Sequence, residues 1–492
     1  MGKFSHQLGS LFPATGCKNE KIPATRLVGN QLARKLMLNS LNIKLYMKKN
    51  YLNCFFQYPF QHTVLIVCIT LIFSACKDTE GVDEETVTPK PVSLSPKAEI
   101  YDTSVAIEWN KLLLDLLEGD QSIASPMAAR AIGYQNLALY ESIVNGTNRE
   151  TLSGKLYRFG GVPNAVDSLE YNWGLAANVA QYTIIQSFFP KAGTEQNAKI
   201  DALLSKYEKA FRGNASQAII KRSIEYGAAV ATAVFNYARQ DGLNGTDSLL
   251  FNNSYVFPDG LGVWKANPPQ TRPLLTQWKL LRPMHFPNKY LSPIFTIPFS
   301  YRKESAFFAE AMQVYEASKN LTSLQKQKSA YWEGDGLGNN TVCNIFGVLS
   351  EAIAGKSTKL DEAALLYLKG AIVMSDGVIS VWRNKYEFNQ VRPDTYVKET
   401  LDENWKPTLG VSYSPSFPSL SATLAGAVGE LIRTELGGSI KTPFSTSPIT
   451  VSDFKSEVIR AAINGGTNFN NSGQQGYELG ERIFNSTNSI DF

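Results

Sequence analysis

Apolar residues recur at helical spacing through most of the chain from Ser104 onward. Ser125 and Pro126 provide an N-cap followed by a first-turn proline, and Ile132, Leu139 and Ile143 then repeat at the spacing of one helix face. Similar amphipathic stretches occupy residues 105–118, 174–189, 195–211, 216–239, 303–318, 322–332, 341–354, 360–383, 419–435, 450–463 and 473–485. No convincing β-hairpin pattern interrupts them. The sequence therefore predicts an all-α, multi-helix bundle.

One long interval breaks this pattern. Residues 241–300 are rich in Pro, Asn, Gly and aromatic residues, including Pro268-Pro269, Trp278 and Arg282-Pro283. This composition predicts a long irregular excursion over the surface, and loops of such length often border a functional cleft. Because no composition break divides the remainder, residues 101–492 are expected to form one helical domain.

The residues before this domain carry a secretory pattern. In residues 47–76, Lys48 and Lys49 precede an apolar stretch from Thr63 to Phe73, and Ser74-Ala75-Cys76 follows. This end resembles the cleavage box of bacterial lipoproteins and predicts a signal peptide with a lipid attached to Cys76. Residues 1–46 then form a mis-called start or a disordered segment. An uncleaved membrane anchor or a buried apolar strand is the alternative for residues 47–76.

Residues 77–100 are rich in acids, Thr, Val and Pro, which predicts an extended tether. The expected location is therefore the bacterial cell envelope, with the protein lipid-anchored at the outer membrane or cell surface. Cys343 is the one cysteine after Cys76, so the predicted mature chain forms no internal disulfide. Its apolar neighbours predict a buried, inert thiol.

The net charge of +4 is distributed unevenly along the chain. Residues 1–76 hold nine Lys or Arg and one acid, which leaves 39 basic and 43 acidic residues for the rest. The body is mildly acidic, and nucleic-acid binding therefore has little support.

Candidate chemistry begins with two cations. Lys385 and Arg392 are seven residues apart, directly before Pro393. If the preceding helix continues, this spacing stacks both cations on one face, where they suit a tetrahedral oxyanion. On this segment alone, two solvated side chains paired with Glu387 or Asp394 remain the alternative.

Two later segments add polar groups. Ser419 is placed as the N-cap of an apolar helix, and the free amides at a helix start bind anions. About forty residues further on, another helix ends at Gly465-Gly466, just before Asn468.

The three segments together resemble the signature motifs of the vanadium-dependent haloperoxidase and type 2 phosphatidic acid phosphatase superfamily, in its bacterial chloroperoxidase-like branch. The first motif, Lys, six residues, then Arg-Pro, is complete. The second and third are partial. Further resemblance extends over most of the body. The matching positions are Lys385, Arg392 and Pro393; Pro418 and Ser419; Gly465, Gly466 and Phe469; and, outside the motifs, Trp109-Asn110, Ala128 to Ala131, Trp278, Arg282-Pro283, Trp332 to Gly336 and Trp382.

The departures concern the groups that the resemblance assigns to catalysis. Ser421 replaces the histidine that acts as general acid or base, and Asn468 replaces the histidine that attacks phosphorus or coordinates vanadate. Ala462 replaces an arginine, and Ser472 replaces the orienting aspartate. No base is expected beside Ser421, and neither Arg460 nor His285 is expected to substitute for a missing group. The resemblance therefore implies a degenerate member without standard catalysis.

The expected function is an envelope lipoprotein with a residual pocket formed by Lys385, Arg392 and Ser419. This pocket either binds phosphate or a similar anion or has become structural. No metal site and no cofactor are expected, except vanadate if any family activity remains. Two alternatives stay open: an active phosphatase or haloperoxidase that uses non-standard residues, and a partner-binding surface subunit that uses residues 241–300.

Overall fold

In the computed structural model, residues 94–120, 122–243, 250–252, 254–269, 271–334 and 340–492 are described. Contacts group Pro89–Phe492 into one compact unit, separate from Met1–Thr88. The account below concerns the described part of the larger unit. The predicted upstream segment 1–46, the signal peptide with Cys76, and the tether up to residue 93 lie outside it.

The predicted all-α bundle is confirmed. Across the described residues, strands are limited to a short antiparallel pair, β1 (Ser439–Ile440) and β2 (Ile449–Thr450). The helices are α3 (Ser104–Gly119), α4 (Ser125–Ile143), α5 (Trp173–Phe188), α6 (Thr194–Arg212), α7 (Gln217–Ala238), α8 (Ala306–Ser318), α9 (Ser323–Trp332), α10 (Thr341–Gly355), α11 (Leu360–Phe388), α12 (Pro393–Thr400), α13 (Leu420–Glu435), α14 (Val451–Gly465) and α15 (Asn470–Thr487).

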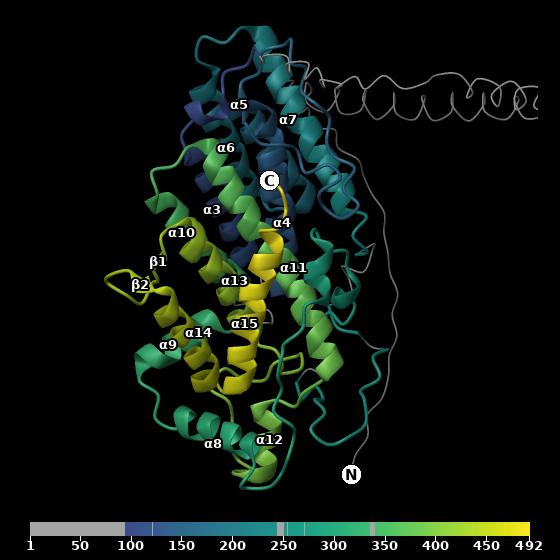
Figure 1. Cartoon of the computed structure of the whole chain (residues 1–492), viewed down its shortest axis with the longest axis vertical. Coiled ribbons are helices and arrows are strands. Elements are labelled where there is room, and N and C mark those ends of the chain that lie inside the picture. The colour runs from purple at the N-terminus through teal and green to yellow at the C-terminus, as the bar shows by residue number, and fades with distance from the viewer. Residues whose placement is uncertain (1–93, 121, 244–249, 253, 270, 335–339) are drawn as a thin grey trace, which may run out of the picture. The chain divides into compact units, whose positions relative to one another are not determined.

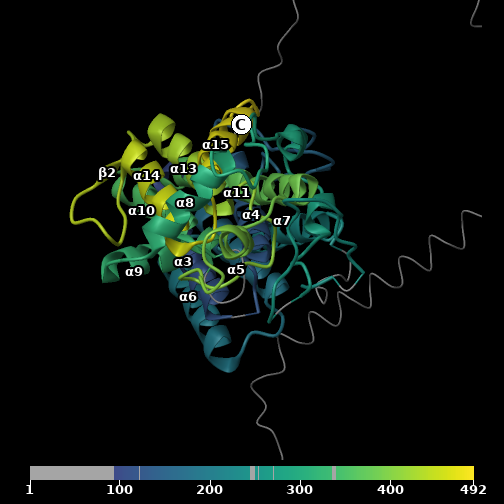
Figure 2. The ribbon, with the colours of Figure 1, turned by 90° about the horizontal axis from the view of Figure 1, so that it is seen from below.

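Helix α11 forms the centre of the bundle. It packs against α4, α10, α13 and α15 (Figures 1 and 2). Its length, and the mean hydropathy of 1.5 in its most apolar segment, would suit a membrane span. However, 94% of that segment is buried inside the protein. An apolar helix surrounded by other helices is a core helix. Its two ends are therefore fixed points from which neighbouring loops can be positioned.

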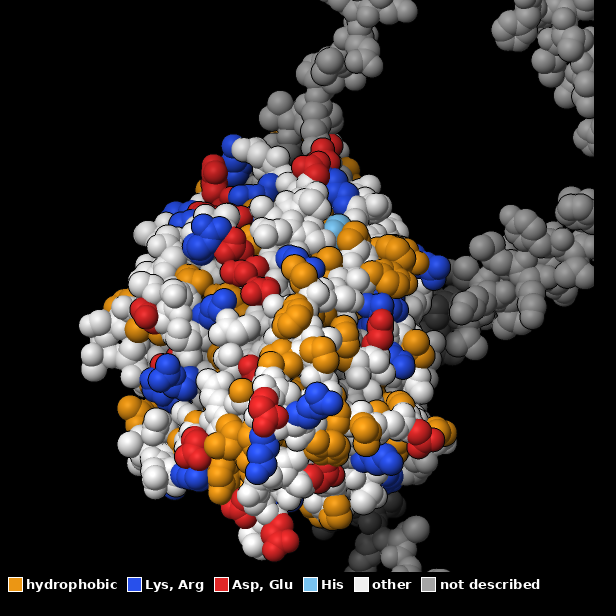
Figure 3. Space-filling model, turned by 60° about the horizontal axis from the view of Figure 1, so that its bottom comes forward, with side chains coloured by type: hydrophobic (Ala, Val, Ile, Leu, Met, Phe, Trp, Pro, Cys, Tyr) orange, Lys and Arg blue, Asp and Glu red, His pale blue; other side chains and the backbone are white. Residues whose placement is uncertain are grey.

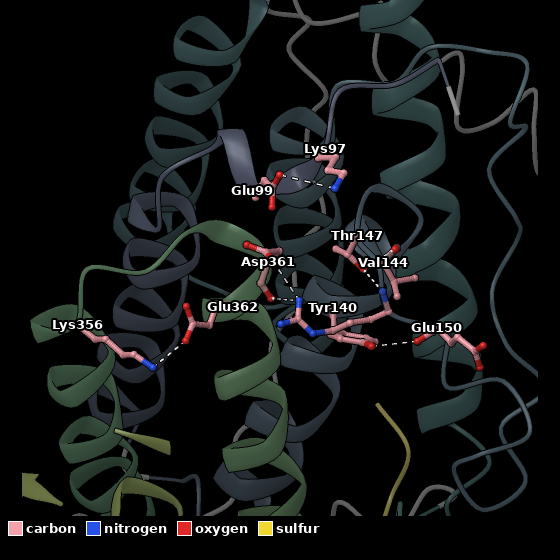
Figure 4. Close-up of polar contacts among 10 residues, drawn as sticks. Lys97, Glu99, Tyr140, Val144, Thr147, Glu150, Lys356, Asp361 and Glu362 are labelled. Carbon is pink, nitrogen blue, oxygen red and sulfur yellow. Dashed lines mark hydrogen bonds and ion pairs between the residues drawn. The ribbon is translucent and has the colours of Figure 1, made fainter. Parts of the chain in front are cut away.

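Polar contacts hold the amino-terminal end of α11 (Figure 4). Asp361 in its first turn pairs with Arg149 at 3.1 Å, and Glu362 pairs with Lys356 at 2.7 Å. The Tyr140 hydroxyl, at the end of α4, donates to the carbonyl of Glu150 at 2.9 Å. The Arg149–Asp361 pair ties the connection after α4 to the start of α11, and the Lys356–Glu362 pair ties the end of α10 to it.

Helices α13 and α15 run parallel and unusually close. The Ser419 amide donates to the Ser472 carbonyl at 3.1 Å, so both helices begin at the same end. Further along, a Cβ built on Gly480 would clash with the Thr423 carbonyl and lie 2.7 Å from the Ala427 amide nitrogen. A glycine is needed for so close a backbone approach. This contact sets the distance between the loops that precede the two helices.

The irregular excursion between Asp241 and Ser300 is also confirmed. Its described regular elements are two short 3-10 helices, η4 (Trp278–Leu280) and η5 (Phe286–Tyr290). Asp376, fully buried in α11, accepts from the Met284 amide at 2.7 Å and the His285 amide at 2.8 Å. Burial raises the pKa of Asp376 to about 7, although these hydrogen bonds oppose the rise. The excursion is therefore anchored to the core helix.

Three local expectations are wrong. Ser125 is the first residue of α4 and not its cap, because its hydroxyl donates instead to the Gly334 carbonyl at 2.7 Å. Helix α11 does not reach Arg392, because Asn389 adopts a left-handed conformation (φ 46°) and ends it. Helix α12, which begins at Pro393, was not expected because its eight residues are too few to show a clear periodicity.

Replacing Gly480 with Ala tests the close contact of α13 and α15. We expect Gly480→Ala to lower the free energy of unfolding by about 1–3 kcal/mol, because the added methyl group overpacks the interface. Gly347, in α10, has nothing within 4 Å of a built Cβ, so Gly347→Ala should raise stability by about 0.4–1 kcal/mol. Urea denaturation of both variants measures the difference, and equal effects would contradict the assigned packing.

Candidate functional site

A cavity of about 320 Å³ lies where four helix ends meet. The carboxyl-terminal ends of α9 and α11 and the amino-terminal ends of α13 and α15 contribute polar groups, and Arg392 comes from the turn before α12. The loop before α13 completes the lining. The polar groups used below are Glu333, Lys385, Arg392, Ser421, Thr467 and Asn468. Three segments singled out in the sequence therefore meet at one cavity.

The two predicted cations are interior. Lys385 is 1% exposed and Arg392 is 3% exposed. The alternative of two solvated side chains is therefore wrong. Glu387 pairs with Arg383 at 2.9 Å, and Asp394 accepts from Asn267 at 2.8 Å.

Backbone carbonyls surround both cations. The Arg392 guanidinium donates to the carbonyls of Ser414 at 2.6 Å, Pro415 at 3.2 Å and Thr467 at 2.8 Å. It also donates to the Ser414 hydroxyl at 3.1 Å and the Asn468 amide oxygen at 3.3 Å. Each of the three guanidinium nitrogens therefore donates to at least one acceptor of the protein. Arg392 thus holds the two loops that precede α13 and α15.

Lys385 reaches the same loop although it lies on a different element from Arg392. Its ammonium donates to the carbonyls of Pro415 at 2.6 Å and Ser416 at 3.4 Å. Both cations therefore converge on Pro415, as expected, but they do so through a turn and not along one helix face.

A carboxylate that was not expected at the site lies between the motifs. Glu333, directly after α9, accepts through one oxygen from the Ser421 hydroxyl. Its other oxygen accepts from the Thr467 hydroxyl at 2.9 Å and the Asn468 side-chain amide at 3.1 Å. The expectation that Ser421 lacks a base is therefore wrong. Glu333 belongs to the run Trp332 to Gly336, whose resemblance to the family could have drawn attention to it.

Ser419 and Ser421 begin α13. The Ser419 hydroxyl accepts from the Ala422 amide at 3.3 Å, which confirms Ser419 as the N-cap. It also lies 3.0 Å from the Ser421 hydroxyl. Ser421 lines the cavity, whereas Ser419 stands behind it as a fully buried support.

Of the residues predicted around Gly465-Gly466, one lines the cavity. Asn468 lines the cavity and contacts Arg392 through its oxygen and Glu333 through its nitrogen. Ala462 is buried within α14, and its carbonyl accepts from the Thr467 amide at 3.1 Å. Ser472 donates its hydroxyl to the Ser416 carbonyl at 2.9 Å and therefore has a structural contact.

The remaining sequence candidates lie elsewhere. Arg460 is exposed on α14 and lines a different pocket from the candidate site. The backbone amide of His285 donates to Asp376, and burial lowers the pKa of the His285 imidazole. Cys343 is buried in α10, and this burial raises the pKa of its thiol, as expected for an inert cysteine.

The donor set at the cavity suits an oxyanion better than a coordinated metal. Within the described residues, no group of three or more His, Cys, Asp or Glu side chains could hold a metal ion. Covalent coordination of vanadate at the third motif would need an imidazole, and the amide of Asn468 cannot replace it. The residues present therefore fit hydrogen bonding to an oxyanion but not vanadium coordination through Asn468.

Comparison with known proteins bears on the fold. No family model and no curated protein matches the chain. Among solved structures, the chain is similar to a bacterial vanadium-dependent iodoperoxidase, with a TM-score of 0.68, 20% identity, and coverage of 79% of this chain and 96% of that one.

Two structures of bacterial vanadium-dependent chloroperoxidase are also similar. The holo form has a TM-score of 0.56 and 16% identity over 74% of this chain and 91% of that chain. The apo form has the same TM-score and 14% identity over 74% of this chain and 93% of that chain. The chain therefore has the all-α fold of the bacterial vanadium-dependent haloperoxidases, as the resemblance of its motifs predicts.

Proposed function

We propose that this protein is a lipid-anchored component of the bacterial cell envelope that lacks the standard catalysis of its fold relatives and uses the pocket to hold a small oxyanion. One observation carries the proposal. The carboxylate of Glu333 receives hydrogen bonds from Ser421, Thr467 and Asn468, beside two buried cations. The donors that bind this carboxylate can bind a free oxyanion in its place.

The side chains at the two histidine positions support the loss of standard catalysis. Asn468 neither attacks phosphorus nor titrates near neutral pH, and Ser421 does not act as a general acid at neutral pH. In enzymes that depend on such a residue, its removal lowers the rate by about 10⁴ to 10⁶. Lys385 and Arg392 remain, and both hold the loop around Pro415 through its carbonyls.

Glu333 acts as an internal competitor in this proposal. A free phosphate or vanadate ion must replace the carboxylate at Ser421, Thr467 and Asn468. Two anions in contact also repel each other by about 1–4 kcal/mol, depending on solvent exposure. The native pocket is therefore expected to bind free oxyanions weakly, and binding should strengthen when the carboxylate is removed.

Calorimetric titration of the chain from Lys77 to Phe492 tests this competition. We expect Glu333→Ala to bind phosphate and vanadate at least about tenfold more tightly than the unchanged chain, because a repelling charge and an occupying group are both removed. Glu316→Ala is the matched control, because Glu316 is an exposed helical acid paired with Lys319. This control should bind phosphate as the unchanged chain does.

The second variant identifies the site of binding. Adding Lys385→Ala to Glu333→Ala should remove the gain in affinity, since it removes a buried cation of the pocket. Absence of heat for Glu333→Ala at millimolar phosphate would reject the oxyanion pocket and leave a purely structural role for both cations.

One observation favours a second candidate function. The Ser421 hydroxyl donates to Glu333, so Ser421 has the base that a nucleophile needs. In this alternative, Ser421 oxygen bonds to the phosphorus of a phosphate ester as the bond to the leaving alcohol breaks. Glu333 takes the serine proton and passes it to that alcohol, and water then releases phosphate.

Assays of phosphate release and of vanadate- and peroxide-dependent bromide oxidation separate the two candidates. The leading proposal expects both rates to equal those of a Ser421→Ala, Glu333→Gln double variant. Phosphate release that is lost in each single variant, while Ser419→Ala retains part of it, would establish the hydrolase instead.

The envelope location rests on the signal pattern that ends at Cys76. We expect the full chain, expressed in a bacterium that processes lipoproteins, to incorporate labelled palmitate and to fractionate with membranes. Cys76→Ser should abolish the labelling, whereas Cys68→Ser, which precedes the cleavage point, should leave it unchanged. Labelling that survives Cys76→Ser would contradict the assigned lipid site.

A further inference from the structure

The excursion presents a row of large hydrophobic side chains to solvent. Between Leu280 and Phe295, five such side chains have exposed fractions from 42% to 74%. We call this row the apolar strip; its members are Leu280, Phe286, Tyr290, Ile294 and Phe295. Figure 3 shows hydrophobic side chains on one face of the molecule, with Lys, Arg, Asp and Glu side chains among them. Contiguous exposed apolar surface marks an interaction site more often than scattered residues do.

Polar side chains of the core helices hold the backbone of the strip in place. Ser380 and Asn384 of α11 both donate to the Leu291 carbonyl, at 3.0 Å and 2.9 Å. One residue later, Arg383 donates to the Ser292 hydroxyl at 3.1 Å, and Arg482 of α15 donates to the Ser292 carbonyl.

Side-chain hydrogen bonds also hold the backbone at the end of the strip. The Gln475 side-chain oxygen accepts from the amides of Ile294 at 3.1 Å and Phe295 at 2.8 Å. The rings of Phe286 and Tyr290 lie 5.2 Å apart, and Arg383 lies 5.6 Å from the centre of the Tyr290 ring. The hydrophobic side chains are therefore held outward by a fixed scaffold.

Along the sequence, this segment carries charge of one sign, although acids of α11 and α15 lie beside it. Residues 260–303 contain seven Lys or Arg and no Asp or Glu. Lys289, within the strip, donates to the carbonyls of Leu280 and Leu281 at 3.2 Å and 3.0 Å. Burial lowers the pKa of Lys289, and the nearby charge of Arg383 lowers it further. The acids beside the strip belong to α11 and α15: Glu387 pairs with Arg383, and Glu478 accepts from Gln475.

The position of the predicted lipid also bears on the partner. Seventeen residues lie between Cys76 and Leu94, the first described residue. An extended chain of this length spans at most about 60 Å, which allows different faces of the domain to reach the bilayer that holds the lipid. A face that combines exposed apolar side chains with cations would bind the bilayer in preference to the other faces.

We propose that the apolar strip docks on an anionic phospholipid membrane, with its hydrophobic side chains at the acyl boundary and its cations at the headgroups. Apolar insertion and attraction to anionic lipids act together at such interfaces. Docking would turn one face of the tethered domain toward the bilayer. The proposal is independent of the oxyanion pocket, because the strip and the cavity share no lining residue.

Vesicle co-sedimentation tests this docking without the lipid anchor. The chain from Lys77 to Phe492 contains the whole compact unit Pro89–Phe492. We expect it to bind vesicles of 30% phosphatidylglycerol in phosphatidylcholine at least tenfold more than vesicles of phosphatidylcholine alone. Binding should fall steeply between low and high salt, because screening weakens the attraction of the cations to the headgroups.

Paired variants locate the surface. Ile294→Ser with Phe295→Ser should lower vesicle binding at least tenfold, whereas Val166→Ser with Leu324→Ser should leave it unchanged. The control side chains are 50% exposed and lie on other elements. Circular dichroism melting of each variant checks that the fold is retained. Absence of binding to anionic vesicles, or equal losses in both pairs, would overturn the proposal. Self-association through the strip in sedimentation experiments, without lipid binding, would assign it to a protein contact instead.

Discussion

The burial of two cations constrains the whole candidate site. An unpaired charge in a protein interior is strongly destabilising, so Lys385 and Arg392 must be surrounded by acceptors. The structure supplies them mainly from the backbone, through the carbonyls of Ser414, Pro415 and Thr467. The loops before α13 and α15 are therefore shaped around the cations. The form of the pocket therefore depends on the backbone contacts of the two cations.

The packing of the helices also shapes the pocket. Gly480 lets α13 and α15 approach closely, and Ser421 in the first turn of α13 and Asn468 just before α15 face one cavity. Neither contact depends on an imidazole. The side chains at positions 421 and 468 therefore determine the chemistry of the site, whereas the backbone that positions them depends on other contacts. Fold and activity are separate consequences of the sequence here, because core packing specifies one and a few polar side chains specify the other.

Sequence patterns predicted the helices well because amphipathic periodicity is a local property. The convergence of Lys385, Arg392 and Asn468 came from the spacing of motifs, and the resemblance to a known family supplied what local patterns could not. Glu333 could not be placed in this way. It lies 88 positions from Ser421 and 135 from Asn468, and only the tertiary packing of α9 and α14 brings it near them. The turn at Asn389 was also missed, because a left-handed Asn is a single-residue feature without periodicity.

The amide of Asn468 lies between the two kinds of charge at the pocket. Its oxygen accepts from Arg392, which can only donate, and its nitrogen donates to the carboxylate of Glu333, which accepts. The two partners therefore fix the orientation of the amide. A histidine at this position could gain a proton and would then lose its acceptor toward Arg392. Asn468 instead links a cation and an anion without titrating between pH 5 and 8.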